Sequence, residues 1–299
     1  MKVFVAGGSG AIGLPLVRAL RASGHEVTAL TRSGARGDTL RALGASVAVA
    51  DALDPEALAA AVAAARPTHV VHELTAIPKG GVRRADDLDL TNRLRTEGTR
   101  NLLDAAIGAG ARRFVAGSFA ILSPRGAGPA DAAAQAVHSM ETQVLDATKR
   151  GAIEGIVLRY GLFYGFEAPS TVAMLDMVRK RRLPVIRGDA GQLPVIHIDD
   201  AVSATIRALD HGHAGATLDI VDDRAVSMTE MVEALAEYTG SKTPFRVPAW
   251  IPRLFAPYVA RMATVRMPLS NAAARAELGW RPVYPTMRDG LAHMFPHAA

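Results

Sequence analysis

The sequence predicts an α/β fold, with a doubly wound parallel sheet and a smaller C-terminal lobe. Apolar, strand-like runs alternate with helical patterns up to about residue 165, and this alternation is typical of a parallel sheet covered by helices on both faces. The 299 residues are 49% hydrophobic, enough for one large domain or two intimately joined ones. Beyond residue 165 the alternation loosens, which indicates additions at the carboxyl edge of the sheet.

The chain begins with a strand, a glycine turn and a helix. The apolar run Val3 to Ala6 enters a loop with glycines at 7, 8, 10 and 13, and Leu14, Leu16, Val17 and Leu20 follow at helical spacing. Glycine tolerates positive φ and close approach of a ligand, and the helix offers free N–H groups and its positive dipole end. We expect Gly7, Gly10, Ala11, Ile12 and Gly13 to hold a pyrophosphate.

The second predicted strand, residues 25–31, ends at Thr31, Arg32 and Ser33. In such a fold this end meets the adenosine ribose, where a carboxylate would bind both hydroxyls and an arginine would pair with a 2′-phosphate. Arg32 therefore favours NADP(H) over NAD(H), and Ser33 is expected beside it at the cofactor. A surface arginine pointing into water is the alternative.

The remaining pattern extends the same architecture. The exit of the fourth strand, Glu73 to Ala76, should lie over the cofactor, because ligands gather at the carboxyl ends of parallel strands. Further strands are expected at 46–50, 67–72, 113–118 and 155–159, and helices from residue 37 and at 55–66, 89–109, 171–182 and 201–209. We expect a nucleotide-binding domain of residues 1–165 plus about 192–222, and a substrate-binding lobe of about 166–191 and 223–299.

By its motifs the chain resembles an atypical extended short-chain dehydrogenase/reductase of the NAD-dependent epimerase/dehydratase family, with a Rossmann-type sheet. The resemblance runs through Ala6 to Gly13, Val49 to Asp51, Val70 to Ala76, Asn92, 97–103, Phe114 to Ser118, Leu158 to Gly165, Ile196 to Asp200, 270–271 and 277–282. It implies that Asp51, with Ala52, meets the adenine, that Leu74 and Thr75 line the cofactor, and that Asn92 supports the central helix. A turn residue is the alternative for Asp51, and a structural clasp is the plainer interpretation of His197 with its aspartates.

One departure from the family pattern concerns the chemistry. Family members that work at a carbinol use a Ser or Thr after the fifth strand and a Tyr-x-x-x-Lys on the next helix, which pass a proton while hydride moves. Phe119, Ala136 and Met140 align with these positions, and no Tyr occurs between Thr75 and Arg159. Another group must carry the proton, or the reaction needs none from the protein.

Three residues are the candidate catalytic groups: Tyr164, His138 and Ser118. Tyr164 is expected, with Tyr160, in a loop that faces the nicotinamide after the sixth strand, His138 on the helix that normally carries the tyrosine, and Ser118 at the end of the fifth strand. Glu73 is an unusual carboxylate at an otherwise apolar strand end. Each has a plain alternative as a packed aromatic, a solvent-facing histidine, a capped strand end or a helix-end carboxylate.

The expected function is an NADP(H)-dependent oxidoreductase that reduces a carbonyl or enone of a small, largely apolar metabolite with a non-standard proton donor. The segment Gly191 to Val195 lacks the arginine that sugar-nucleotide members usually carry before the HxDD element, which weakens a nucleotide-sugar interpretation. Two alternatives stay open: a non-redox isomerase, cyclase or lyase that retains its cofactor, and an NADP(H)-sensing binding protein.

Composition limits the other possibilities. The chain has no cysteine and carries a formal net charge of +5 spread along its length, so we expect no disulfide or thiolate chemistry, no metal and no nucleic-acid partner. No stretch approaches 18 apolar residues, and we expect no membrane partner and a cytoplasmic protein. A small-molecule substrate is the expected partner, and a homodimer is one candidate assembly.

Overall fold

The structure is a computed structural model of the 299-residue chain. It describes residues 1–32, 34–78, 82, 84–123, 131–188, 191–248, 250–255, 260, 266–267 and 269–297.

A seven-stranded sheet in which every pairing is parallel forms the centre of the fold, with strand order β3-β2-β1-β4-β5-β6-β10. Its strands are β1 (Lys2–Ala6), β2 (Glu26–Thr31), β3 (Ser46–Val49), β4 (His69–His72), β5 (Arg113–Phe119), β6 (Glu154–Tyr160) and β10 (Thr217–Ile220). The order reverses between β1 and β4, and this switch point is where open α/β sheets bind ligands. The α/β fold class expected from the sequence is confirmed.

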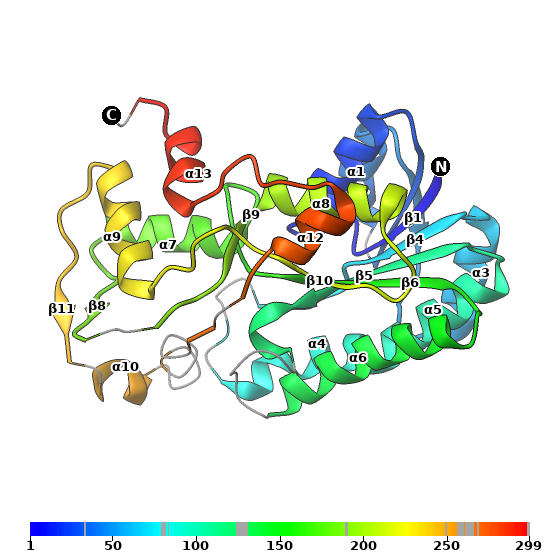
Figure 1. The fold of residues 1–299 in the computed structure, drawn as a ribbon, viewed down its shortest axis with the longest axis horizontal. Helices are drawn as coiled ribbons and strands as arrows, with labels where there is room; N and C mark the ends of the chain where they lie inside the picture. The colour runs from blue at the N-terminus through cyan, green and yellow to red at the C-terminus, as the bar shows by residue number, and fades with distance from the viewer. Residues whose placement is uncertain are drawn as a thin grey trace.

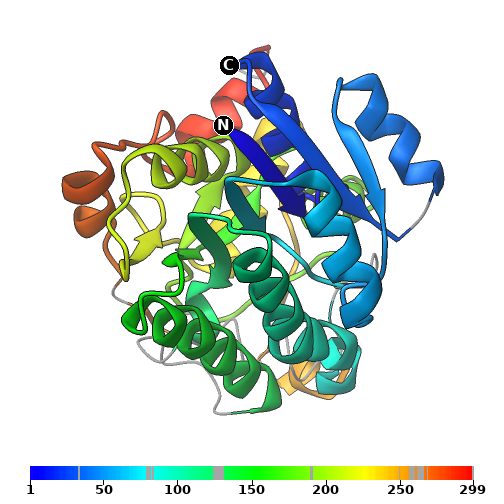
Figure 2. The same cartoon turned by 90° about the vertical axis from the view of Figure 1, so that its right-hand side faces the viewer.

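Helices cover both faces of this sheet. In Figure 1, α3, α5 and α6 lie below it and α1, α8 and α12 above it, and Figure 2 shows the same layers from the side. The helices of these layers are α1 (Gly13–Ala22), α2 (Gly34–Ala42), α3 (Pro55–Ala65), α4 (Asp89–Arg93), α5 (Thr99–Gly108), α6 (Ala132–Lys149), α8 (Ile198–His211) and α12 (Ala272–Leu278). The apolar core is correspondingly divided into two clusters, one on each face of the sheet.

Smaller elements gather at the carboxyl end of the sheet, on the left of Figure 1. They are β7 (Leu162–Tyr164), α7 (Pro169–Arg179), β8 (Val185–Ile186), β9 (Val195–His197), α9 (Met228–Tyr238), β11 (Arg246–Val247), α10 (Trp250–Phe255) and α13 (Met287–Met294). A third apolar cluster, which includes Tyr164, Leu175, Leu235 and Leu291, packs here. The division into two lobes at the residues proposed from the sequence stays a prediction.

Two local features differ from the expectation. The helix expected over 89–109 is interrupted by a π-helical turn, Leu94–Gly98, between α4 and α5; such turns are frequent at functional sites. The expected loop after the sixth strand is also wrong: Tyr160 is the last residue of β6, and Tyr164 ends β7, which pairs with β9. A three-residue strand is too short to show a sequence period, so only its partner reveals it.

Candidate functional site

The glycine loop between β1 and α1 leaves no room for a side chain at Gly7 or Gly13. Gly7 has φ +91°, and a Cβ there would lie 2.4 Å from the Glu73 carbonyl oxygen. A Cβ at Gly13 would lie 2.1 Å from the Gly7 carbonyl oxygen, and the Gly10 amide donates to that same oxygen at 2.8 Å. Glycine at 7 and 13 is therefore required by the backbone itself.

The N-terminus of α1 is electrostatically open. Its N-cap, Ile12, makes no side-chain cap hydrogen bond, and the first turn has no acidic residue. By contrast, Asp54 caps α3 by accepting from the Ala57 amide. An uncapped helix start behind a tight glycine turn suits an anion, because the helix dipole is positive there. The Leu14 amide already donates to the Gly10 carbonyl oxygen at 3.1 Å and Pro15 has no N–H, so neither of these two residues offers a free amide. The residues present thus fit the pyrophosphate of a dinucleotide.

Residues expected at the adenosine half follow β2 and β3. Arg32 is exposed directly after β2; Ser33 lies outside the described residues. The Asp51 carboxylate accepts from the Leu53 amide at 3.0 Å, a turn hydrogen bond, so the turn role is present in the fold. The buried Ala52 accepts from Asn101 of α5 at 3.0 Å. The cofactor contacts of all these residues stay predictions.

The exit of β4 is held by a buried histidine. His72 Nδ1 accepts from the Leu74 amide at 3.2 Å, and its Nε2 lies 2.8 Å from Thr99 Oγ1. Burial lowers the pKa of His72 to about 4, so the ring is neutral and donates from Nε2. Leu74 is half-buried and Thr75 exposed beyond this anchor.

Asn92, expected to support the central helix, lies on α4 two residues before the first residue of the π-helical turn. Its side-chain Oδ1 is buried and has no hydrogen-bond partner among the described residues. Its carbonyl oxygen accepts from the Thr96 hydroxyl at 3.0 Å. A role for Asn92 at the cofactor stays a prediction.

Ser118, at the end of β5, belongs to a buried ion-pair cluster. Its hydroxyl donates to Glu141 Oε1 at 2.7 Å, and Arg159 donates to the two Glu141 oxygens at 2.8 and 2.6 Å. All three side chains are buried. The cluster joins β5, α6 and β6, so the hydroxyl is already engaged in the core.

The Tyr164 side chain packs in the third apolar cluster, among the smaller elements at the carboxyl end of the sheet. Its hydroxyl donates to Asp222 Oδ2 at 2.9 Å and lies 3.3 Å from the Thr286 carbonyl oxygen. Burial and the neighbouring Asp222 raise the pKa of Tyr164, and burial raises the pKa of Asp222 to about 8. The pair holds its protons tightly, and a role for Tyr164 as proton donor stays a prediction.

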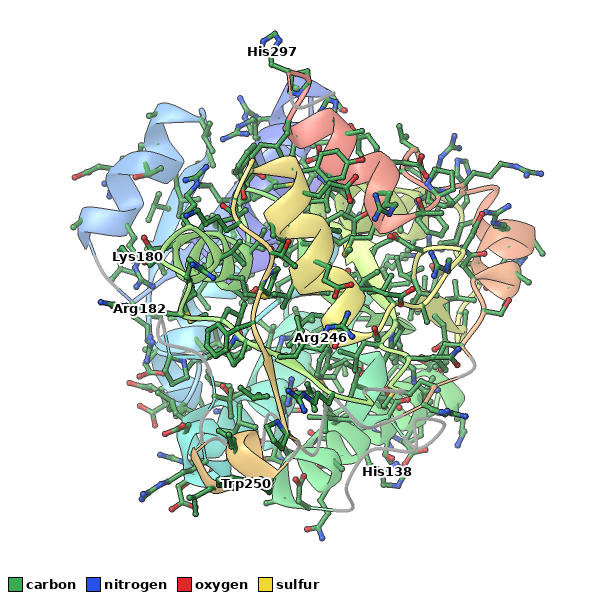
Figure 3. The ribbon with its side chains drawn as sticks, turned by 90° about the vertical axis from the view of Figure 1, so that its left-hand side faces the viewer. His138, Lys180, Arg182, Arg246, Trp250 and His297 are labelled. Atoms are coloured by element: carbon green, nitrogen blue, oxygen red, sulfur yellow. The ribbon has the colours of Figure 1, made fainter. Side chains whose placement is uncertain are left out.

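His138 lies elsewhere. It is exposed on α6, and Figure 3 shows it at the periphery of the molecule. Its helix neighbours Ala136 and Met140 are buried, while Phe119 is half-buried after Ser118. The three candidate catalytic side chains therefore have different surroundings: a buried ion pair for Ser118, a buried contact with Asp222 for Tyr164 and the outer surface for His138.

A different polar group is enclosed at the switch point. The Tyr160 hydroxyl lies 3.0 Å from Glu73 Oε1 and 2.7 Å from Thr205 Oγ1, and the Thr205 hydroxyl donates to the Ala201 carbonyl oxygen at 2.7 Å. All three side chains are buried. Burial raises the pKa of Glu73 to about 8 and that of Tyr160 well above its ordinary value.

Sequence reasoning singled out Glu73 and Tyr160 but did not connect them, and it missed Thr205, Glu141 and Asp222. A signal existed for Glu141, since a carboxylate on the apolar face of α6 and the arginine inside β6 predict a buried pair. No pattern in the sequence predicts that residues 73, 160 and 205 meet. Their proximity follows from the order of the strands in the sheet and from the packing of α8 on it. The HxDD segment is the clasp expected from the plainer interpretation: the Asp200 oxygens accept from the Val283 and Tyr284 amides at 2.7 and 3.0 Å.

Comparison with known proteins agrees with this architecture. A family model described as NAD dependent epimerase/dehydratase family matches residues 3–222. A curated relative named 3-diazoavenalumate denitrifying reductase, from Streptomyces sp, is 39% identical over 309 residues, covering 97% of this chain and 99% of the relative. UDP-glucose 4-epimerase of Vibrio cholerae is 25% identical over 70% of each chain.

Solved structures share the whole fold. The UDP-glucose 4-epimerase of Thermus thermophilus, in complex with NAD, superposes with a TM-score of 0.81 at 23% identity and covers 100% of this chain and 99% of its own. The dTDP-glucose 4,6-dehydratase DesIV of Streptomyces venezuelae, also with NAD bound, gives 0.80 at 20% identity and covers 99% of this chain and 96% of its own. At these identities the likeness shows the fold alone.

Proposed function

Because the chain belongs to the NAD dependent epimerase/dehydratase family, we propose that it is an NADP(H)-dependent reductase of a small, largely apolar molecule. The family and the relatives indicate a nicotinamide-dependent epimerase, dehydratase or reductase. One contrast supports the finer proposal: the backbone requires glycine at positions 7 and 13 of a loop suited to a pyrophosphate, whereas no Tyr occurs between Thr75 and Arg159.

Different parts of the chain bind different groups of the cofactor. The loop from Gly7 to Gly13 and the open start of α1 receive the pyrophosphate. Arg32, exposed after β2 with no acid at positions 31–33, supports a 2′-phosphate and hence NADP(H). When bound, the reduced cofactor supplies a hydride.

A missing proton relay limits which acceptors suit the enzyme. A simple ketone becomes a strongly basic alkoxide when it accepts hydride, and it needs an acid beside it. A conjugated enone becomes a more stable enolate that water can protonate. A small enone is therefore favoured over an isolated ketone, with Tyr164 or water as the proton donor.

A diazo compound is the second candidate substrate. The 39% identical relative is named for the reductive denitrification of 3-diazoavenalumate. Overall, one hydride and one proton replace the diazo group and dinitrogen leaves. The departure of dinitrogen avoids an alkoxide, so this chemistry also suits a site without the tyrosine.

The test mixes the purified protein and NADPH with matched ketones, enones and a ¹⁵N-labelled aromatic diazo ketone. We expect loss of NADPH with the enone or the diazo compound, and labelled dinitrogen by mass spectrometry in the second case. Tight NADPH binding without turnover of any acceptor would count against the proposal. Product formed without net cofactor oxidation would favour a non-redox isomerase, cyclase or lyase, and unequal affinities for the two cofactor forms without turnover would favour a sensor.

A further inference from the structure

The Glu73 side chain is enclosed at the carboxyl edge of the sheet. Glu73 follows β4 directly; its side chain lies against Gly117 in β5 and Tyr160 at the end of β6, and Gly7 after β1 lies against its main-chain carbonyl group. A Cβ at Gly117 would lie 2.2 Å from Glu73 Oε2. Glycine at 117 therefore provides the space that the carboxyl group occupies.

Counting hydrogens determines the protonation state of this group. Three short oxygen–oxygen contacts run in sequence from Glu73 to Tyr160 (3.0 Å), Thr205 (2.7 Å) and the Ala201 carbonyl (2.7 Å). Tyr160 and Thr205 bring one hydrogen each, and a carbonyl brings none. With an ionised Glu73 one contact would join two lone pairs, so the third hydrogen must belong to the carboxyl group. Glu73 then donates to Tyr160, Tyr160 to Thr205, and Thr205 to Ala201.

Among the described residues, none near Glu73 supplies a charge that would stabilise a carboxylate. Of the elements packed against its side chain, β5 contributes Gly117, α8 contributes Thr205 and Ala201, and β6 contributes Tyr160, the one titratable neighbour among these residues. The adjacent His72 is neutral and bonded to Thr99. Burial raises the pKa of Glu73 to about 8, which agrees with the hydrogen count.

The position of Glu73 relative to the cofactor follows from the sheet. A dinucleotide lies across the switch point with its pyrophosphate on the glycine loop and one nucleoside over each half of the sheet. Arg32 and Asp51 follow β2 and β3 and would take the adenosine. Glu73 lies among β4, β5 and β6, on the other half, where the nicotinamide belongs.

We propose that Glu73 is a neutral carboxylic acid in the folded protein and loses its proton when the oxidised, cationic nicotinamide binds, whereas the uncharged reduced ring leaves it protonated. The hydrogen count stands without the cofactor, and the coupling rests on the proposed function. The balance is simple: binding of the oxidised form converts the carboxylic acid to a carboxylate beside the ring cation and releases one proton to water. Electrons do not move in this step.

The first arm of the test measures unfolding by urea from pH 5 to 8.5 in the wild type and in Glu73→Gln. The amide of Gln can donate to Tyr160 as the acid does, so the variant should fold. If the Glu73 carboxyl has a higher pKa in the folded than in the unfolded state, the wild type loses stability relative to Glu73→Gln as the pH rises between those two pKa values. The unfolding constant should change by up to about tenfold per pH unit in that range. A difference independent of pH would overturn the neutral acid.

Thr205→Val provides a second variant with a defined direction. Without the Thr205 hydroxyl, Tyr160 is released to donate to Glu73, which favours the carboxylate. In Thr205→Val the loss of stability with rising pH should therefore end at a lower pH than it does in the wild type. An unchanged transition would contradict the ordered chain of donors. Glu141→Gln is the matched control: it removes another buried glutamate, one that is paired with Arg159, and it should lower stability at every pH.

The second arm measures proton release when NADP⁺ or NADPH binds at pH 7, by calorimetry in buffers of different ionisation enthalpy. We expect release with NADP⁺, none with NADPH, and none with either ligand in Glu73→Gln. Equal proton release by both cofactor forms would overturn the coupling. Failure of both forms to bind would contradict the proposed function and the coupling, but not the neutral acid, which the first arm decides.

Discussion

Arg32 is the residue on which the proposed preference for NADP(H) depends. It is exposed directly after β2, beside the open glycine loop, and its carboxylate-free surroundings at residues 31–33 would not repel a phosphate. A guanidinium binds a phosphate through two parallel hydrogen bonds. Loss of that group should affect one cofactor and not the other.

We therefore predict that Arg32→Ala weakens NADPH binding by roughly 10- to 100-fold, the equivalent of about 1.5–3 kcal/mol for charged hydrogen bonds, and leaves NADH binding almost unchanged. Fluorescence titration of both cofactors measures this. Arg36→Ala is the control, because Arg36 is also exposed but lies within α2. Equal weakening of both cofactors by Arg32→Ala would contradict the 2′-phosphate assignment.

Single residues also show how far the sequence could predict the site. Gly7 and Gly13 are predictable, because their requirement comes from the local backbone of a strand–turn–helix unit. Ser118 was correctly placed at a strand end, but its partner Glu141 is 23 positions away on another element. Whether a hydroxyl faces a ligand or a carboxylate is a tertiary property.

At the scale of elements, α6 is fixed to the sheet by an ion pair. Glu141 of α6 binds Arg159 of β6 and Ser118 of β5, and all three are buried. Removing one member of a buried pair leaves the other charge without compensation in a medium of low dielectric constant. The cluster should therefore dominate the docking of this helix.

Glu141→Gln should lower the free energy of unfolding by about 3–5 kcal/mol, as measured by urea denaturation. The control is Glu97→Gln, which breaks an exposed pair with Arg93 and should change stability little, since water screens such pairs. Comparable losses in both variants would show that the Glu141 pair contributes no more than a surface pair.

For the molecule as a whole, buried titratable groups predict an optimum of stability. Burial raises the pKa of Glu73 and Asp222 to about 8, and burial lowers the pKa of His69, His72 and His197 to about 4. At low pH the unfolded histidines bind protons that the folded ones do not, so stability rises with pH. At higher pH the folded carboxyls keep protons that the unfolded chain has released, so stability falls.

The free energy of unfolding should therefore be highest at about pH 6 and should decline from there towards pH 4 and towards pH 8. Urea midpoints across this range measure it. Glu73→Gln and Asp222→Asn should each flatten the decline above pH 6, steepen the rise below it and move the optimum to higher pH, because each carboxyl opposes the histidines from its unfolded pKa upwards. Stability that rises steadily from pH 6 to 8 would contradict the assigned shifts.

The sequence by itself determined the parallel α/β fold, the glycine cradle and the family, because each rests on short-range spacing within one or two consecutive elements. The strand β7 and the π-helical turn inside the helix after β4 escaped it, since both depend on partners elsewhere in the fold. The tertiary structure alone decided which polar side chains meet: Ser118 with Glu141, Tyr164 with Asp222, and Glu73 with Tyr160. Burial and hydrogen-bond partners depend on elements that are distant in sequence and determine whether a carboxyl group holds a proton. The fold could therefore be predicted from the sequence, and the acid–base chemistry of the site could not.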